Sequence, residues 1–175
     1  MKPYADTAGE WSVPARTADK GYPFLFVYGT LLSGLREDWR KKVRAELVGE
    51  GTIKGRLYDL GDYPGVRLAG GRSAKFVRGE LYRLGDPERA TRILDQYEHY
   101  FPVAPEKSLF IRELVMVTLL GRPSEPRALA SVPGGTLADG NKRRAWTYLY
   151  NRPVDHARLI PSGSYRDLLC ACPRS

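Results

Sequence analysis

The chain has 175 residues, of which 28 are Lys or Arg and 20 are Asp or Glu, so its formal net charge is +8. This length suffices to bury one hydrophobic core without disulfides or metals, and we expect a single domain at residues 23–175 behind an extended N-terminal segment at 1–22. The N-terminus lacks a signal-peptide pattern, and no window holds the roughly eighteen apolar residues of a membrane-spanning helix. We therefore expect a soluble, cytoplasmic protein without a membrane partner.

Residue types also narrow the possible ligands. Cys170 and Cys172 lie too close in sequence to bridge each other readily, and the chain has only two histidines besides. We therefore expect free thiols and no metal or cofactor. Two basic runs, at 40–44 and 141–144, lack the interleaved aromatic residues or helix-turn-helix pattern of a nucleic-acid interface. A positive field that attracts small anions explains the charge equally well, so we do not expect a nucleic-acid partner.

The first predicted element is a strand at Phe24–Val27, a continuous run of aromatic and branched residues. A loop follows in which Gly29 lets the backbone turn sharply and approach a ligand closely. The backbone N–H groups of Gly29, Thr30 and Leu31 would suit a carboxylate or a developing oxyanion. The alternative is an ordinary glycine turn with no binding role.

The next segments predict a helix, two strands and the turn between those strands. Apolar residues at every fourth position favour an amphipathic helix over 36–47. They are Leu35, Trp39, Val43 and Leu47. Alternating apolar residues, interrupted by glycines, predict strands at 49–60 and 75–86. Pro64 and Gly65 indicate a turn between them.

The second half of the chain should begin with a short helix at 87–100, with Asp86 as its N-terminal cap and Pro87 as its first residue. An apolar strand at 108–120 and a strand at 144–151 come next. The Pro- and Gly-rich connection at 121–140 between these strands is a candidate lid. A turn and a short helix complete the C-terminal part.

Glu98 is the candidate for acid–base chemistry. The stripe formed by Ala90, Ile93, Leu94 and Tyr97 faces the core, and Glu98 lies four residues past Leu94 at its border. Lost hydration and the C-terminal end of the helix dipole would both raise the pKa of this carboxyl. Repulsion from nearby Asp95 would add to the shift. The alternative is a surface carboxylate that points to water.

Several segments of the chain resemble the gamma-glutamylcyclotransferase-like family, which includes the AIG2-like proteins. They occur in the family's order and cover nearly all of residues 24–166. They read VYGTLLSG, LYDLGDYPGV, VRGELYRL, LDQYEHY, FIRELVMV, RAWTYLY and IPSGSY. The resemblance implies an α+β fold, a small mixed β-barrel flanked by helices with a cavity at one mouth.

The resemblance also implies a reaction and its residues. The loop Tyr28, Gly29, Thr30 and Leu31 would bind the glutamyl end of a small gamma-glutamyl substrate, and Glu98 would be the general acid and base. The substrate's own α-amine would close a lactam, releasing 5-oxoproline and a free amine. The alternative is a non-catalytic relative that holds an anionic metabolite in the same cavity. The oligomeric state stays open.

This sequence departs from the family pattern at two positions and in its additional N-terminal segment. Phe110 stands where a Tyr commonly occurs ahead of the Arg matched by Arg112, and His99 replaces a frequent Gly after the Glu. Arg112 could pair with a substrate carboxylate, but we expect it instead to balance Asp95 or Glu113 at the surface. The departures bear on the pocket for the leaving amine, which sets substrate specificity.

Overall fold

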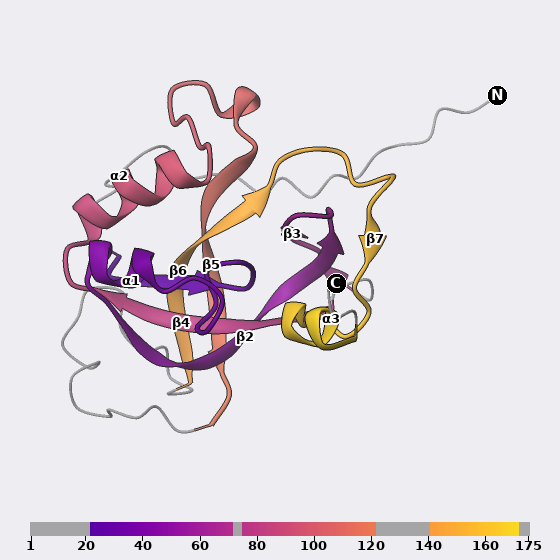
Figure 1. The fold of residues 1–175 in the computed structure, drawn as a ribbon, viewed down its shortest axis with the longest axis horizontal. Coiled ribbons are helices and arrows are strands. Elements are labelled where there is room, and N and C mark those ends of the chain that lie inside the picture. Colours follow the sequence, from indigo (N-terminus) through magenta and orange to yellow (C-terminus); the bar gives the residue numbers. More distant parts are fainter. Residues whose placement is uncertain (1–21, 72–74, 122–140, 172–175) are drawn as a thin grey trace.

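The structure, a computed structural model, describes residues 22–71, 75–121 and 141–171 (Figure 1). The strands are β1 (Phe24–Val27), β2 (Ala45–Asp59), β3 (Pro64–Arg67), β4 (Lys75–Leu84), β5 (Phe110–Leu119), β6 (Lys142–Tyr150) and β7 (Arg158–Leu159). The helices are α1 (Asp38–Val43), α2 (Pro87–Tyr97), the 3-10 turn η2 (Pro105–Lys107) and α3 (Tyr165–Ala171). The expected N-terminal extension and candidate lid fall almost entirely outside the described residues.

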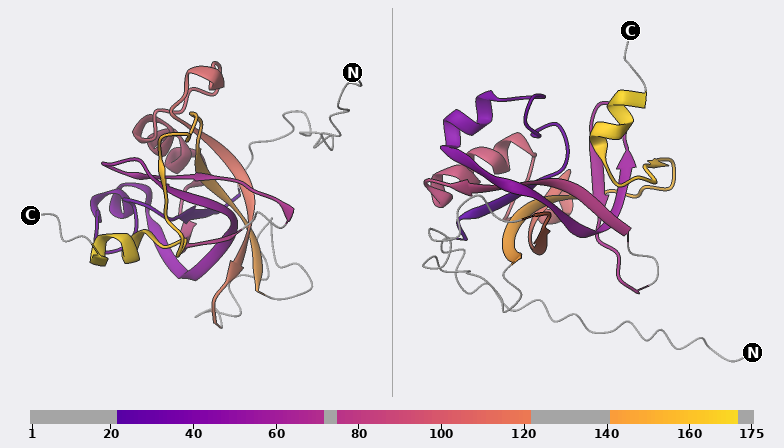
Figure 2. Two further views of the ribbon diagram at one scale, coloured as in Figure 1. Left: turned by 90° about the vertical axis from the view of Figure 1, so that its right-hand side faces the viewer. Right: turned by 90° about the horizontal axis from the view of Figure 1, so that it is seen from below.

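The strands close into a mixed barrel. Its order is β2-β4-β1-β6-β5, and β5 pairs back onto β2 to close the ring. The pairing of β1 with β6 is parallel, whereas the other neighbours in the ring are antiparallel. The expected α+β barrel with flanking helices is therefore confirmed. The distal part of β2 also pairs with β3 and β7, which gather with α3 away from α1 and α2 (Figure 1 and Figure 2).

Strand β1 runs through the middle of this arrangement, between β4 and β6. All four of its residues are buried, which explains why the segment is apolar at every position rather than at alternate ones. Gly79 on β4 makes the close approach of the strands possible. A Cβ at this position would collide with the carbonyl oxygen of Val27 and the ring of Phe26. The last residues of β1 therefore lie in close contact with β4.

Helix α2 begins as the sequence predicts. The Asp86 carboxylate accepts a hydrogen bond from the backbone N–H of Arg89 at 3.0 Å, and Pro87 occupies the first turn. Ala90 and Leu94 on the apolar stripe are buried. The helix therefore ends at a defined place beside the barrel, and Glu98 is its C-terminal cap residue.

Two expectations about local structure are wrong. Helix α1 is shorter than the predicted 36–47, because Arg44 adopts a left-handed conformation (φ 50°) that ends it and residue 45 already pairs with β4. Leu35 and Leu47 are consequently 40% and 48% exposed. The Pro64–Gly65 segment is not the turn itself but the start of β3, and the tight connection precedes it at residues 60–63.

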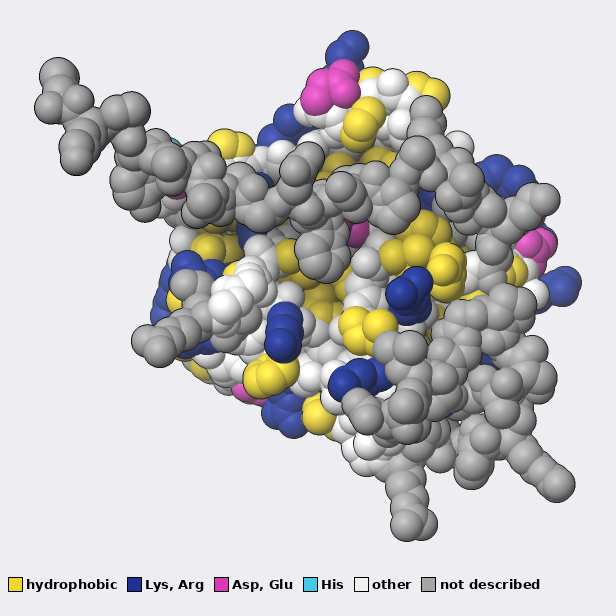
Figure 3. Space-filling view, turned by 180° about the vertical axis from the view of Figure 1, so that it is seen from behind, with side chains coloured by type: hydrophobic (Ala, Val, Ile, Leu, Met, Phe, Trp, Pro, Cys, Tyr) yellow, Lys and Arg dark blue, Asp and Glu magenta, His cyan; other side chains and the backbone are white. Residues whose placement is uncertain are grey.

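The described surface presents no single basic stripe on the face seen from behind, where Lys and Arg side chains are interspersed with apolar ones (Figure 3). Among the described helices, none is both long and apolar enough to cross a bilayer. Cys170 is an exposed free thiol, as expected.

Candidate functional site

A cavity of about 260 Å³ opens where β1 ends. Its wall combines the loop at 28–31, the residues just before β3, the C-terminal end of α2, the start of β5 and one side chain of β6. The residues that enter the chemical argument are Tyr28, Gly29, Thr30, Leu31, Glu98 and Tyr148. The structure thus brings the predicted loop and the predicted carboxylate, remote in sequence, to the wall of one cavity.

The loop folds back immediately after the strand. The backbone N–H of Leu32 donates to the carbonyl of Gly29 at 3.0 Å, which closes a tight turn. Gly29 also lies against Pro64, and a Cβ on it would come within 2.8 Å of the Pro64 Cγ atom. Only glycine therefore lets the loop and the start of β3 approach each other without a shift in either segment.

Tyr28 fixes the first residue of the loop. Its hydroxyl donates to the carbonyl of Tyr148 at 2.6 Å and accepts from the N–H of Val66 at 3.3 Å. Burial, reinforced by the nearby Glu98 carboxyl, raises the pKa of the Tyr28 hydroxyl far above its ordinary value, so the phenol stays neutral. Tyr28 is therefore hydrogen-bonded to both β6 and β3, and it also forms part of the cavity wall.

Glu98 is a poorly hydrated carboxyl in the same wall. Burial raises its pKa from an ordinary value of 4.5 to about 7. The backbone N–H of Glu98 donates to the Leu94 carbonyl at 2.8 Å. The last turn of the helix therefore fixes the backbone of Glu98 and the orientation of its side chain. A carboxyl with this pKa can both take up and release a proton near neutral pH.

Burial accounts for this shift, and the expected repulsion from Asp95 is not among its causes. Asp95 has partners of its own. Its carboxylate accepts a hydrogen bond from the Tyr148 hydroxyl at 2.7 Å and forms an ion pair with Arg112 at 3.4 Å. The expected pairing of Arg112 with Asp95 is confirmed, but it is not at the surface: the two side chains are only 6% and 14% exposed. This pair anchors α2 to β5 beneath the cavity.

The mouth of the cavity carries Arg36 and Asp62, which the sequence did not single out. Tyr97 also lines it, so the expectation that this residue faces the core is wrong: its side chain is 40% exposed and its hydroxyl accepts a hydrogen bond from the Arg36 guanidinium at 3.1 Å. His99, at the position where the resemblance has a frequent Gly, has a φ of 51° and also lines the mouth. The left-handed backbone explains why glycine suits this position. Nothing in the periodicity of the sequence marks these residues as neighbours.

The position of Phe110, the other departure, is part of the cavity wall, where its ring packs edge-on against Tyr63 and Tyr150. On β6, Tyr148 lines the cavity, whereas Tyr150 contacts the ring of Phe110. Within the described residues, no cluster of His, Cys, Asp and Glu side chains could hold a metal ion. The cavity wall therefore combines largely apolar side chains, the carboxyl of Glu98, whose pKa is about 7, and the backbone turn at residues 28–31.

Comparisons with known proteins show the family of this chain. The family model described as gamma-glutamyl cyclotransferase, AIG2-like, matches residues 25–167. A gamma-L-glutamyl-butirosin B gamma-glutamyl cyclotransferase from Niallia circulans is 32% identical over 131 residues, which is 74% of this chain and 68% of that protein. The gamma-glutamylcyclotransferase family protein YtfP of Escherichia coli is 31% identical over 145 residues, 82% of this chain and 96% of that protein.

A solved structure shares the fold. An AIG2-like protein from Mus musculus superposes with a TM-score of 0.51 at 20% identity, over 75% of this chain and 79% of the mouse chain. The family model and the two relatives above 30% identity show which family this is. The chain belongs to the gamma-glutamyl cyclotransferase, AIG2-like family.

Proposed function

We propose that this protein converts a gamma-glutamyl amide into 5-oxoproline and a free amine, with Glu98 as general acid and base and the loop Tyr28–Leu31 as the binding site for the glutamyl group. The observation that carries the proposal is the meeting of these two elements in one cavity. The activity in the name of the Niallia relative supports the general reaction. The identity of the leaving amine is a separate question, because the mouth of the cavity carries both a cationic residue, Arg36, and an anionic residue, Asp62.

The chemistry needs no nucleophile from the protein. The Glu98 carboxylate takes a proton from the substrate's α-ammonium, and the resulting amine attacks the γ-carbonyl carbon to form the ring C–N bond. Backbone N–H groups of the loop then face the oxygen on which negative charge develops. The original amide C–N bond breaks as Glu98 returns its proton to the leaving nitrogen. The ring nitrogen loses a second proton to solvent, and the released amine gains one.

The geometry supplies the two contributions that this reaction requires. Holding the glutamyl arm in the conformer that brings its amine to its carbonyl contributes on the order of several kcal/mol. A carboxyl whose pKa is about 7 can accept the first proton and donate it again at neutral pH. A site that only held an anion would gain nothing from a partly buried carboxyl beside its ligand.

The test is a screen of gamma-glutamyl amides, including gamma-glutamyl amino acids, isopeptides and simple amines, for release of 5-oxoproline. Glu98→Gln is the diagnostic variant, and Glu88→Gln, an exposed carboxylate on the same helix, is the matched control. We expect product from the wild type and the control but only a trace from Glu98→Gln. An undiminished rate in Glu98→Gln refutes the role of this residue. Tight binding of glutamate with no turnover of any compound favours the non-catalytic alternative.

A further inference from the structure

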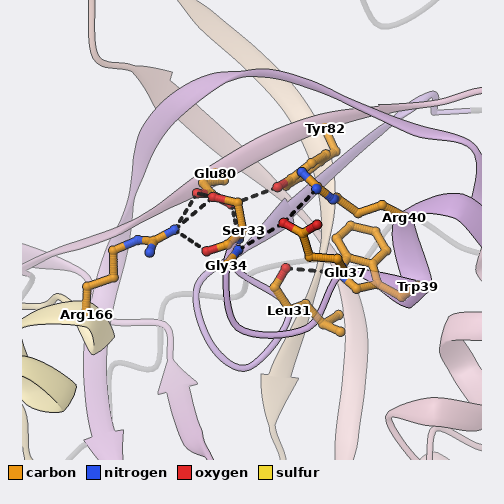
Figure 4. Close-up of polar contacts among 9 residues, drawn as sticks. All are labelled: Leu31, Ser33, Gly34, Glu37, Trp39, Arg40, Glu80, Tyr82 and Arg166. Atoms are coloured by element: carbon orange, nitrogen blue, oxygen red, sulfur yellow. Dashed lines mark hydrogen bonds and ion pairs between the residues drawn. The ribbon is translucent and has the colours of Figure 1, made fainter.

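Glu80 on β4 is a buried carboxylate that the proposed chemistry does not use. It lies opposite Val27, the last residue of β1, and is only 5% exposed. Its two oxygens accept hydrogen bonds from the Ser33 backbone N–H at 2.8 Å, the Ser33 hydroxyl at 2.5 Å and the Tyr82 hydroxyl at 2.8 Å (Figure 4). Arg166 completes the set with an ion pair at 2.8 Å.

These donors keep Glu80 ionised. Burial alone raises the pKa of a carboxyl, but the hydrogen bonds from Ser33, Tyr82 and Arg166 outweigh it and hold the pKa of Glu80 below its ordinary value. A buried charge is tolerated only when it is paired and hydrogen-bonded in this way. The cluster is therefore a persistent ionic contact at neutral pH.

The contacts of the cluster converge on Ser33, which follows the loop at residues 28–31. Arg166, at the start of α3, donates not only to Glu80 but also to the Ser33 carbonyl at 2.8 Å and the Ser33 hydroxyl at 2.9 Å. Ser33 lies two residues beyond Leu31, where the proposed substrate loop ends. Figure 4 shows the side chains of Glu80 and Arg166 reaching Ser33 from two different elements. The cluster thus joins β4, α3 and the loop.

The loop is consequently held at both ends. Tyr28 pins its first residue to β6 and β3, and the indole N–H of Trp39 donates to the Leu31 carbonyl at 3.0 Å. Glu80 and Arg166 fix the chain immediately afterwards. The backbone N–H groups that would face the glutamyl group lie between these anchors, and a displacement of about 1 Å in a catalytic group can lower a rate about 10²-fold.

We propose that Glu80 and Arg166 form an ionic clamp on Ser33 that sets the orientation of the substrate loop, which makes Glu80 a positioning residue. This inference rests on the proposed function for its kinetic consequence, but not for its effect on the loop itself. The clamp predicts that the loop loosens when either charge is removed, while the barrel, held by backbone pairing of β4 with β1 and β2, persists.

The experiment compares Glu80→Gln and Arg166→Ala with the control variants Glu46→Gln and Arg83→Gln. The controls break another ion pair, between β2 and β4, whose side chains are 69% and 37% exposed. Amide hydrogen exchange of Leu32 and Ser33, whose N–H groups donate to the Gly29 carbonyl and to Glu80, is measured without substrate, and kcat and KM are measured by 5-oxoproline release. We expect exchange at least tenfold faster in this loop for both clamp variants, and kcat lowered ten- to a hundredfold with a smaller change in KM. The controls should match the wild type.

Chemical rescue separates the clamp from a general loss of structure. Guanidinium ion at low millimolar concentration should restore part of kcat and of the exchange protection to Arg166→Ala, and Arg166→Lys should retain more activity than Arg166→Ala. Unchanged loop exchange in the clamp variants, or exchange that accelerates equally throughout the barrel, overturns the inference. If Glu80→Gln does not fold, the Arg166 variants decide it. A wild type with no cyclisation activity refutes the proposed function, whereas loop exchange still judges the clamp.

Discussion

Replacing Glu98 by Gln should lower activity and, above neutral pH, raise stability. Burial raises the pKa of Glu98 in the folded state from 4.5 to about 7. The folded protein therefore holds this proton more tightly than the unfolded chain does. The stability that comes from the bound proton is fully present below the unfolded pKa and is lost as the pH rises through the folded pKa.

The size of the effect follows from the shift. At about 1.4 kcal/mol for each pH unit between the two pKa values, ionising Glu98 costs the folded state up to about 3 kcal/mol. Glutamine keeps the shape but does not ionise, so Glu98→Gln avoids this cost. Relative to any difference between the two proteins at about pH 4, the variant should become more stable by up to about 3 kcal/mol at about pH 8.

Urea denaturation at these two pH values measures the difference. With a slope of about 1–3 kcal/mol per molar, the midpoint of Glu98→Gln should move above that of the wild type by up to about 1–3 M at the higher pH. Glu88→Gln controls for the loss of one negative charge from the helix. A gap between wild type and Glu98→Gln that does not grow with pH would refute the view that Glu98 is poorly hydrated. The same variant should lose about 10²- to 10⁴-fold in kcat/KM.

Further variants test the loop and its neighbours. Gly29→Ala should raise KM and lower kcat at least tenfold, because its Cβ would come within 2.8 Å of Pro64 and shift the turn; an active variant with wild-type KM would contradict this. Tyr28→Phe should lose about 1–2 kcal/mol of stability by thermal or urea unfolding, since the Tyr148 carbonyl is left without its buried donor. His99→Gly should raise stability by about 0.5 kcal/mol, because φ is 51° there; a loss would show that the imidazole has a compensating contact.

The parts of the fold that the sequence predicts well are those with strong local signals. Strand β1 is apolar at every position, and α2 has a capping Asp, a Pro in its first turn and a clear apolar stripe, so both lie where expected. The predicted helix at 36–47 is longer than the observed helix α1, because Leu47 continues the spacing of four although it belongs to β2. The spacing alone does not show that the chain pairs with β4 from residue 45 onward, because this pairing is a tertiary contact.

The site shows the same limit more strongly. Periodicity places Glu98 at the end of a helix and Gly29 after a strand, but their meeting depends on the closure of the barrel and on the Asp95–Arg112 pair that joins α2 to β5. The family resemblance supplied that connection. Glu80 gave no signal, because it shares a strand face with exposed Phe76 and Arg78. The segments that cover it, at Ser33 and Arg166, are remote in sequence.

The most direct test of the central claim follows the oxygen atoms of the product. The wild-type protein is incubated with a reactive gamma-glutamyl amide in water enriched in oxygen-18, and the products are analysed by mass spectrometry. Intramolecular ring closure predicts 5-oxoproline with no solvent oxygen, because the substrate's own amine replaces the leaving amine. Glutamate that carries one oxygen-18 atom would mean that water attacks the γ-carbonyl, and would contradict the account.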